Sequence, residues 1–482
     1  MREGHPFAKV STNATALKVA ASLGALGAVG LAHGSAFAQA ASTPPAPPPS
    51  EVQPQMPTPD KPPEPARILT LPAAEHAALE EQPQLRVARA QTAVAQAAAE
   101  QLKSPLLPQV TGIAQYGHEW GSFRSVGSGV TLSGTSAGSG STSLANSFDT
   151  YSVGVSASQL IYDFGQTSEK WVAARDTAEA QRYEEQVTRL NIVSTVRQAY
   201  FVARANKELV DVAKETLDNQ LKHLVQVQAF VTVGTQPEIA LAQQKAAVAN
   251  AKVQLIASQN NYETAKAQLN EAAGLVGGTE YDVTDEQEPP VNDEEQPLET
   301  LVEKAFAARP ELANLWKQEE SEHASIRAAK GGYGPSLAAT GGASESAILP
   351  ASPSPNANIG VTLTWLLFQG GLTKATVRAA EANLTSITAT RDLTRLQIQL
   401  GVNTAQLAVR AAKATIGAAD DAATSAHEQL RLAEQRYATG VGNIIELDDA
   451  QVAYTSAAAQ VVQARYNLAS ARAQLLAALG RT

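Results

Sequence analysis

Residues 447–479 repeat with a period of seven. Two series share this spacing, one of large apolar residues and one of alanine: Leu447, Tyr454, Val461, Leu468 and Leu475, and Ala450, Ala457, Ala464, Ala471 and Ala478. Five unbroken heptads with polar residues on the other faces are typical of a long helix in a coiled-coil interface rather than in a globular core. The alanine series predicts that the partner helix approaches closely.

The same pattern occurs 206 positions earlier in the chain. Its members are Leu241, Val248, Leu255, Tyr262 and Leu269, with Ala251, Ser258, Ala265 and Ala272 as the small series. Other matches lie at two offsets: Leu71, Pro83, Leu85, Lys103 and Pro108 recur 227 positions later, and 206 positions later Phe368 matches Tyr162 while Gly165, Gly234 and Gly274 recur. The difference of 21 residues (227 minus 206) falls between Pro108 and Tyr162. We therefore predict an internal duplication whose first half has the longer insert.

The first 38 residues have the features of a secretory signal peptide. Arg2, Lys9 and Lys18 precede an apolar run of 14 residues at 19–32, and Ala-Phe-Ala at 36–38 offers a cleavage site. A spanning helix needs about 20 residues, so cleavage near Ala38 is favoured over a retained anchor. The mature chain is predicted to be exported.

Residues 39–66 are dominated by proline, alanine and polar residues. Such a segment cannot bury enough surface to fold, so we predict a disordered, proline-rich linker. The sequence contains no cysteine. This excludes disulfides, thiolate metal sites and attachment through a lipidated N-terminal cysteine.

The composition of the remainder favours elongated helices over several compact domains. Aromatic residues make up only 5% of the sequence. The formal net charge is −10, the pI is about 5.4, and lysine and arginine form no cluster. Because phosphate binding needs clustered basic residues, we expect no nucleic-acid partner.

Each half contains one segment pair with the period of a β-strand. Residues 151–158 and 356–365 alternate apolar with small or polar residues, and weaker alternation precedes them at 109–120 and 336–344. We predict one β-hairpin at 109–161 and another at 336–366. The loop of the first, from Gly121 to Ser147, is rich in glycine and serine, and that of the second, from Glu345 to Pro355, is short.

Exported strands of about ten residues with one apolar face fit a transmembrane β-barrel. The alternative is a soluble antiparallel sheet with one face on a core. Two strands from each half cannot close a barrel, so closure would need several chains.

After each hairpin the chain is predicted to become helical. Gly165 stands at the first strand-to-helix switch and Gly370 and Gly371 at the second, with Thr167 and Thr373 as expected N-caps. Residues 167–230 contain no proline, which predicts one very long helix. Long helical hairpins are expected at 165–274 and 371–480.

The return helices have start signals of their own. Thr235, Pro237 and Glu238 are expected to form a capping-box entry to the first, and Asn443 and Glu446 to begin the second.

Several features together resemble a known family. They are the glycine switch after each hairpin, the run Arg436-Tyr437-Ala438-Thr439-Gly440, the run Leu447-Asp448-Asp449-Ala450-Gln451, and the terminal Ala478-Leu479-Gly480. In this order they resemble the TolC family of outer-membrane efflux proteins over about residues 69–480. The resemblance implies a mixed α+β membrane protein and a homotrimer. Each protomer would give four strands to one transmembrane β-barrel and its helices to a long periplasmic α-helical barrel.

The predicted organisation is a first repeat at 67–275, an acidic linker at 276–297 and a second repeat at 298–482. Each repeat holds a helix, a β-hairpin and a long helical hairpin. Paired acidic residues in the linker are interpreted as a solvated segment rather than a carboxylate active site. The seven histidines are dispersed and only two methionines occur, so we predict no metal site, no cofactor and no enzyme activity.

The resemblance also assigns roles at the helical tips. Glu446 and Asp449 occupy positions that line the constricted entrance in the family, where three copies would form rings of negative charge. The alternative is that Glu446 completes the helix cap and that Asp449 benefits from the helix dipole. The first half has Ala240 and Gln243 at the equivalent positions, so the charge comes from one repeat only.

The turns at the two tips resemble the family's contact points for a periplasmic adaptor protein. Their residues are Gly234, Thr235, Gly440, Val441 and Gly442. Plain helix-terminating glycines explain the glycines equally well. A basic gate residue known in the family would fall at Gly442, so that link cannot be transferred.

The function predicted from the sequence is a passive exit duct in the outer membrane. It would contact membrane lipid and receive substrates from an inner-membrane pump through the adaptor. The outer-membrane component of type I protein secretion is an alternative within the class. A periplasmic coiled-coil scaffold is the alternative from another class.

Overall fold

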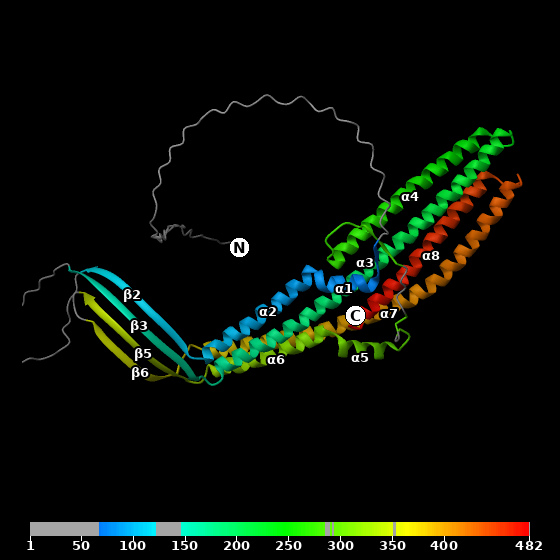
Figure 1. Ribbon diagram of the computed structural model, residues 1–482. Helices are drawn as coiled ribbons and strands as arrows, with labels where there is room; N and C mark the ends of the chain where they lie inside the picture. The colour runs from blue at the N-terminus through cyan, green and yellow to red at the C-terminus, as the bar shows by residue number, and fades with distance from the viewer. Residues whose placement is uncertain (1–66, 122–145, 285–289, 292–293, 350–352, 482) are drawn as a thin grey trace, which may run out of the picture. The chain divides into compact units, whose positions relative to one another are not determined.

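The computed structural model describes residues 67–121, 146–284, 290–291, 294–349 and 353–481 (Figure 1). The predicted signal peptide (1–38) and proline-rich linker (39–66) lie outside these residues, as does most of the first hairpin loop. All described residues belong to one structural unit, Glu64–Thr482.

Two helices of 67 residues each, α3 (Gln166–Thr232) and α7 (Leu372–Ala438), form the framework of this unit. Neither contains proline, so the backbone hydrogen bonds continue without interruption over roughly 100 Å at 1.5 Å per residue. Each turns back into a shorter helix, α4 (Glu238–Ala273) after α3 and α8 (Ile444–Ala478) after α7. None of the described helices combines the length and the apolar character that crossing a membrane requires.

Two shorter helices pack against this framework near the sheet. α2 (Pro83–Lys103) lies along α3, and α6 (Pro310–Gly331) packs against both α3 and α7 (Figure 1). Each follows an 11-residue helix, α1 (Leu71–Glu81) or α5 (Leu298–Ala308). Proline is the first residue of α2 and of α6, where its missing N–H would have had no partner within the helix. One helix therefore ends and the next begins within two residues.

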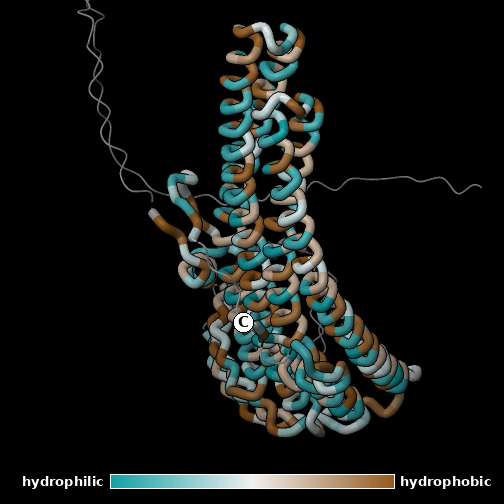
Figure 2. Tube along the Cα trace, turned by 90° about the vertical axis from the view of Figure 1, so that its right-hand side faces the viewer, coloured by the Kyte–Doolittle hydropathy of each residue, from teal (hydrophilic) through white to brown (hydrophobic). Residues whose placement is uncertain are grey.

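The last helix, α8, is buried on two faces. Its alanine series is buried throughout, and Leu447 and Leu475 are fully buried where α8 packs on α7. On another face Val462, Tyr466 and Ala473 join α3 in a second apolar cluster. The small series of α4 is likewise buried. The coiled-coil packing that the heptads predict is confirmed, and hydrophobic and hydrophilic positions alternate along the helices accordingly (Figure 2).

Four antiparallel strands form the larger sheet, in the order β2-β3-β5-β6. Their bounds are β2 Gln109–Gly121, β3 Asn146–Tyr162, β5 Ser336–Leu349 and β6 Ser354–Thr364. The strands of the second hairpin extend further toward the loop than the alternating segments at 336–344 and 356–365. β5 continues through Glu345 to Leu349, and β6 begins at Ser354. The short loop expected from Glu345 to Pro355 is therefore mostly strand.

The register of this sheet aligns the apolar residues of all four strands. In one row Val110 pairs with Ala157, Ala157 with Gly341, and Gly341 with Ile359. Direct neighbours lie on the same face, and side chains alternate between faces. One face therefore carries Val110, Ala114, Tyr116, Tyr151, Val153, Val155, Leu337, Ala339, Ala343, Ile359, Val361 and Leu363, together with the ionisable His118, Asp149 and Glu345. The opposite face is mostly serine, threonine, asparagine, glycine and alanine, and Ile113 and Leu160 are large apolar residues on it.

A small parallel pair of strands was not predicted. β1 (Arg67–Leu69) pairs with β4 (Tyr281–Val283), which lies inside the predicted acidic linker. The hydroxyl of Tyr200 on α3 donates to carbonyl oxygens of Leu69 and Thr284 at this pair, 3.3 and 3.2 Å away. Three residues per strand are too few to give a periodic signal in the sequence.

The acidic linker was predicted to be solvated, but one of its residues is buried. Glu294 is 7% exposed and forms salt bridges with Lys413 of α7 (2.6 Å) and Arg472 of α8 (3.2 Å). Its neighbour Glu295 remains exposed while contacting the same lysine. The interpretation as a solvated segment is therefore wrong at Glu294, because two cations from the long helices compensate its burial.

Candidate functional site

The two tips of the helical hairpins are built alike. Gly234 and Gly440 adopt φ angles of 82° and 77°, and these left-handed residues end α3 and α7. The following N–H groups, of Thr235 and Val441, each donate back into the last helical turn over 3.0 Å. Apolar packing joins the tips, including Phe230 of α3 and Tyr437 of α7, whose ring centroids are 5.7 Å apart.

Gly442 has a different role from the other two tip glycines. A Cβ at this position would lie 2.8 Å from the backbone nitrogen of Tyr437 and 2.9 Å from the carbonyl carbon of Arg436. The turn before α8 therefore folds onto the end of α7 more tightly than a side chain would allow. The first half has Gln236 at the equivalent position.

Only part of the expected capping is found. The Asn443 side chain accepts a hydrogen bond from the N–H of Ile445 (3.2 Å), as the predicted start of α8 requires. The predicted capping box before α4 is wrong: Pro237 is the N-cap, without a side-chain bond, and the Thr235 hydroxyl donates to the carbonyl of Phe230 instead. Glu446 does not complete a cap either.

The three acidic residues at the start of α8 have different surroundings. Glu446 forms a salt bridge with Arg436 of α7 (3.1 Å), and both side chains are about half exposed. Asp449 is exposed and makes no ion pair with any described residue. Asp448 is half-buried, and this burial together with the charge of Asp449 raises its pKa, against the effect of Gln220. The predicted entrance residues thus lie together, with Asp449 as the carboxylate that is neither paired nor buried.

A layer of buried polar side chains lies just beyond the tips. Gln220 and His223 of α3, Gln244 of α4 and Gln451 of α8 are at most 5% exposed. The Gln244 amide donates to the backbone carbonyl of Gln220 (3.1 Å). Burial lowers the pKa of His223, although Glu434 of α7 lies 3.7 Å from its Nε2. This layer could not be predicted from the sequence, because glutamine between heptad positions is typical of a solvated face.

The strand-to-helix switches form a second candidate region. Gly165 and Gly371 are the N-caps of α3 and α7, with φ angles of 84° and 85°, and Gly370 is also left-handed at 59°. Thr167 and Thr373 lie inside the helices, so their predicted capping role is wrong. The Asp163 carboxylate instead accepts a hydrogen bond from the N–H of Thr167 (2.7 Å), where the helix dipole favours a negative charge.

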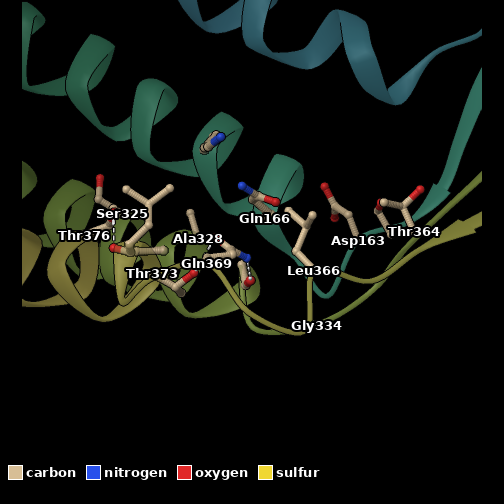
Figure 3. A pocket seen from close by; sticks show the side chains of 15 residues that line it. Asp163, Gln166, Ser325, Ala328, Gly334, Thr364, Leu366, Gln369, Thr373 and Thr376 are labelled. Atoms are coloured by element: carbon tan, nitrogen blue, oxygen red, sulfur yellow. Dashed lines mark hydrogen bonds between the residues drawn. The ribbon is translucent and has the colours of Figure 1, made fainter.

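A cavity of about 400 Å³ opens between the ends of α3, α6 and α7 (Figure 3). Hydroxyl and amide side chains dominate its lining, including Gln166 from α3, Ser325 from α6, and Thr373 and Thr376 from α7. No part of the described chain brings together three histidine or acidic side chains that could hold a metal ion. The lining also includes the charged side chains of Asp163 and Lys170.

Comparisons with known proteins agree with this architecture. The model of the family "Outer membrane efflux protein" matches residues 75–275 and 301–481. The probable outer membrane lipoprotein SilC of Salmonella typhimurium is 25% identical over 238 residues, which are 48% of this chain and 50% of that protein. The pyoverdine export outer membrane protein OpmQ of Pseudomonas aeruginosa is 25% identical over 250 residues, 49% of this chain and 50% of that protein. The match thus spans about half the length of these curated relatives.

Solved structures resemble the chain over a greater length. The outer membrane protein VceC of Vibrio cholerae superposes with a TM-score of 0.71 at 18% identity, covering 85% of this chain and 96% of that one. Identity this low establishes the fold alone. The family match covers both halves and confirms the resemblance inferred from the sequence. The chain belongs to the outer membrane efflux protein family.

Proposed function

We propose that three copies of this chain form a passive exit duct in the outer membrane. The observation that carries the proposal is the register of the larger sheet, which places most of the large apolar residues of its four strands on one face. Its edge strands β2 and β6 are each paired on one side only, with β3 and β5, and no described strand lies against their outer edges. A membrane tolerates no open edge, so four strands must close with strands of other copies. Three copies would give 3 × 4 = 12 strands.

The helices support continuation of the duct into the periplasm. α3 and α7 have equal length, and the two halves follow the same order of elements, as expected for an internal repeat. Coiled-coil packing between hairpins could continue around a trimer to form the α-helical barrel. The family and the fold are those of transport channels rather than enzymes. We therefore assign the energy source to an inner-membrane pump, which a periplasmic adaptor connects to the tips.

The tips supply the proposed entrance and adaptor contacts. Three copies of Asp449 would form an exposed acidic ring favouring cations, while Arg436 offsets the charge of Glu446. Val441 is 75% exposed between Gly440 and Gly442, which suits a contact with another protein. SilC is named a lipoprotein, but this sequence has no cysteine to carry a lipid. We propose that signal-peptide cleavage and sheet insertion alone place the chain in the outer membrane.

Conductance of the purified protein in planar bilayers tests the duct. We expect discrete cation-selective channels, together with a detergent-extracted trimer whose electrophoretic migration changes on heating. A folded, monomeric protein that forms no channels would instead support the periplasmic scaffold.

A further inference from the structure

An open groove of about 630 Å³ lies where the larger sheet meets the helices. Three aromatic residues line it: Phe164 from the first switch, Tyr333 after α6, and Trp365 after β6. Two basic residues from the last turns of α6, Arg327 and Lys330, line it as well. Aromatic rings beside cations are the side chains that accommodate the boundary between lipid headgroups and acyl chains.

The aromatic ring of Phe164 is held in the groove by a constrained backbone. Phe164 is the one non-glycine residue with positive φ (55°) in the described chain, and its side chain is 50% exposed. A Cβ on Gly334 would lie within 2.4 Å of the ring, so this glycine provides the space that the ring occupies. A bulky residue in this conformation persists only where its surroundings impose it, and such strain concentrates at functional positions.

Beside the groove, an apolar run is exposed along its whole length. Trp365, Leu366, Leu367 and Phe368 are 58, 65, 79 and 89% exposed and lie in an irregular segment between β6 and α7. The Trp365 indole N–H donates to the carbonyl of Tyr333 (3.2 Å), which fixes the ring at the groove. Four consecutive exposed apolar side chains are costly in water, and they follow directly after the end of β6 at Thr364.

The helix ends that adjoin the sheet add positive charge in a chain with a net charge of −10. Each carries an exposed lysine: Lys103 ends α2, Lys170 lies in the second turn of α3, Lys374 lies in the first turn of α7, and Lys330 lies next to the end of α6. In the first turn of a helix the dipole disfavours a cation, so helix stability does not explain Lys374. Arg327 is paired with Glu169 (2.8 Å), but Lys330 has no ion pair with a described residue.

We propose that this groove binds the headgroup of an anionic phospholipid. The phosphate would lie at Lys330, with Arg327 beside it, and the glycerol and upper acyl chains against Phe164 and Trp365. The site rests on the proposed function, which places the sheet in the outer membrane and this junction at the periplasmic surface of its inner leaflet. The lysines of the other helix ends would attract further anionic lipids around the trimer.

The test uses the full-length mature protein reconstituted in nanodiscs that contain equal amounts of phosphatidylglycerol and phosphatidylcholine. Lipids that remain bound after extraction into mild detergent are quantified by mass spectrometry. We expect wild type to retain phosphatidylglycerol preferentially and Lys330→Gln to lower that preference about fivefold, the effect of one basic side chain at an anionic surface. Lys330→Arg should keep the preference, and so should Lys245→Gln, which removes an exposed lysine from α4 far from the sheet.

The outcomes separate this site from the duct itself. Equal retention of both lipids by a correctly inserted wild type, or an unchanged preference in Lys330→Gln, overturns the lipid site and leaves the duct intact. Displacement of phosphatidylglycerol by excess inorganic phosphate alone would likewise reduce the groove to a general anion site. Failure of wild type to enter nanodiscs of any composition would overturn the proposed function and the lipid site together. A photoreactive residue in place of Phe164 should crosslink to lipid, and crosslinking to a second copy would contradict the proposal.

Discussion

Glu446 at the start of α8 forms a salt bridge with Arg436 near the end of α7, across the turn that makes the second tip. Because both side chains are about half exposed, the pair stabilises the fold by at most about 1 kcal/mol. The salt bridge affects the charge at the tip more than it affects stability. Each protomer presents Asp449 as an uncompensated carboxylate and Glu446 as a compensated one, so the two acidic positions are not equivalent.

This difference predicts how ion selectivity responds to mutation. Asp449→Asn should reduce the preference for cations, because it removes the unpaired charge of the ring. Arg436→Gln should increase that preference, because it releases the charge of Glu446, and should change stability by less than about 1 kcal/mol. Reversal potentials across bilayers with asymmetric KCl measure both effects. Selectivity that is the same in both variants and in wild type would rule out the proposed entrance.

The close approach at Gly442 predicts a stability difference between two glycine substitutions. Gly442→Ala should destabilise the tip by about 2 kcal/mol, because the new methyl group would overlap backbone atoms of Tyr437 and Arg436. Gly417→Ala is the control: this glycine lies inside α7 with open space around its Cβ position, so alanine should stabilise the helix by about 0.5–1 kcal/mol. Thermal unfolding in detergent, followed by circular dichroism, measures both changes. Equal changes in melting temperature in the two variants would contradict the close packing described for Gly442.

Glu294 should matter far more to stability than its neighbour in the sequence. Glu294→Gln leaves Arg472 and Lys413 without their buried partner and should cost about 3 kcal/mol. The matched substitution Glu295→Gln changes a carboxylate whose side chain is 86% exposed and should cost less than about 0.5 kcal/mol. Chemical denaturation in detergent compares the two variants.

The same residue predicts a dependence on acid pH. Burial would raise the pKa of Glu294, but its bonds with Lys413 and Arg472 outweigh burial and lower it. The ionised form is therefore stabilised by folding, and this contribution is present above the unfolded pKa of about 4.3 and lost as pH falls through the lower folded value. Below that value Glu294→Gln and wild type should approach each other in stability. If the difference in unfolding free energy between the two proteins stays constant down to the most acidic pH, the salt bridges of Glu294 do not stabilise this region.

His223 predicts a second dependence of stability on pH. Here burial lowers the pKa of the side chain, whereas at Glu294 the bonds with two cations lower it. The burial of His223 favours the neutral imidazole and lowers its pKa, so the unfolded chain binds more protons below about pH 6.5. Wild type should therefore lose stability as pH falls from about 6.5, and His223→Gln should lose less over the same interval. Melting temperatures measured at successive pH values test this. Parallel curves for the two proteins would show that His223 titrates as it does in the unfolded chain.

The sequence predicts those parts of the fold that depend on periodicity. Leu447 and Leu475 identify the α8 seam, and the alternation around Val153 and Val361 identifies two of the four strands, because buried faces repeat regularly. Capping was harder to predict. Thr167 has the right residue type, but the left-handed Gly165 begins the helix earlier, and Asp163 reaches the free N–H groups from outside it.

Contacts between distant segments leave no local pattern. Nothing near Glu294 in the sequence indicates Arg472, which is 178 residues away. Gln244 and Gln451 are of a residue type that predicts a solvated helix face. They are buried because other helices pack over them. At the candidate entrance, Glu446 and Asp449 could be predicted, but the pairing with Arg436 that makes them unequal depends on the tip geometry.

The unpaired edges of the larger sheet bear on how the chain reaches its membrane. A single copy inserted alone would expose the N–H and C=O groups of β2 and β6 to hydrocarbon, at several kcal/mol for each unsatisfied group. Insertion should therefore be a collective event, slow at low protein concentration and rising steeply with it. In the proposed trimer, one copy mutated at either edge strand would block two intact copies, so that such an allele would be dominant.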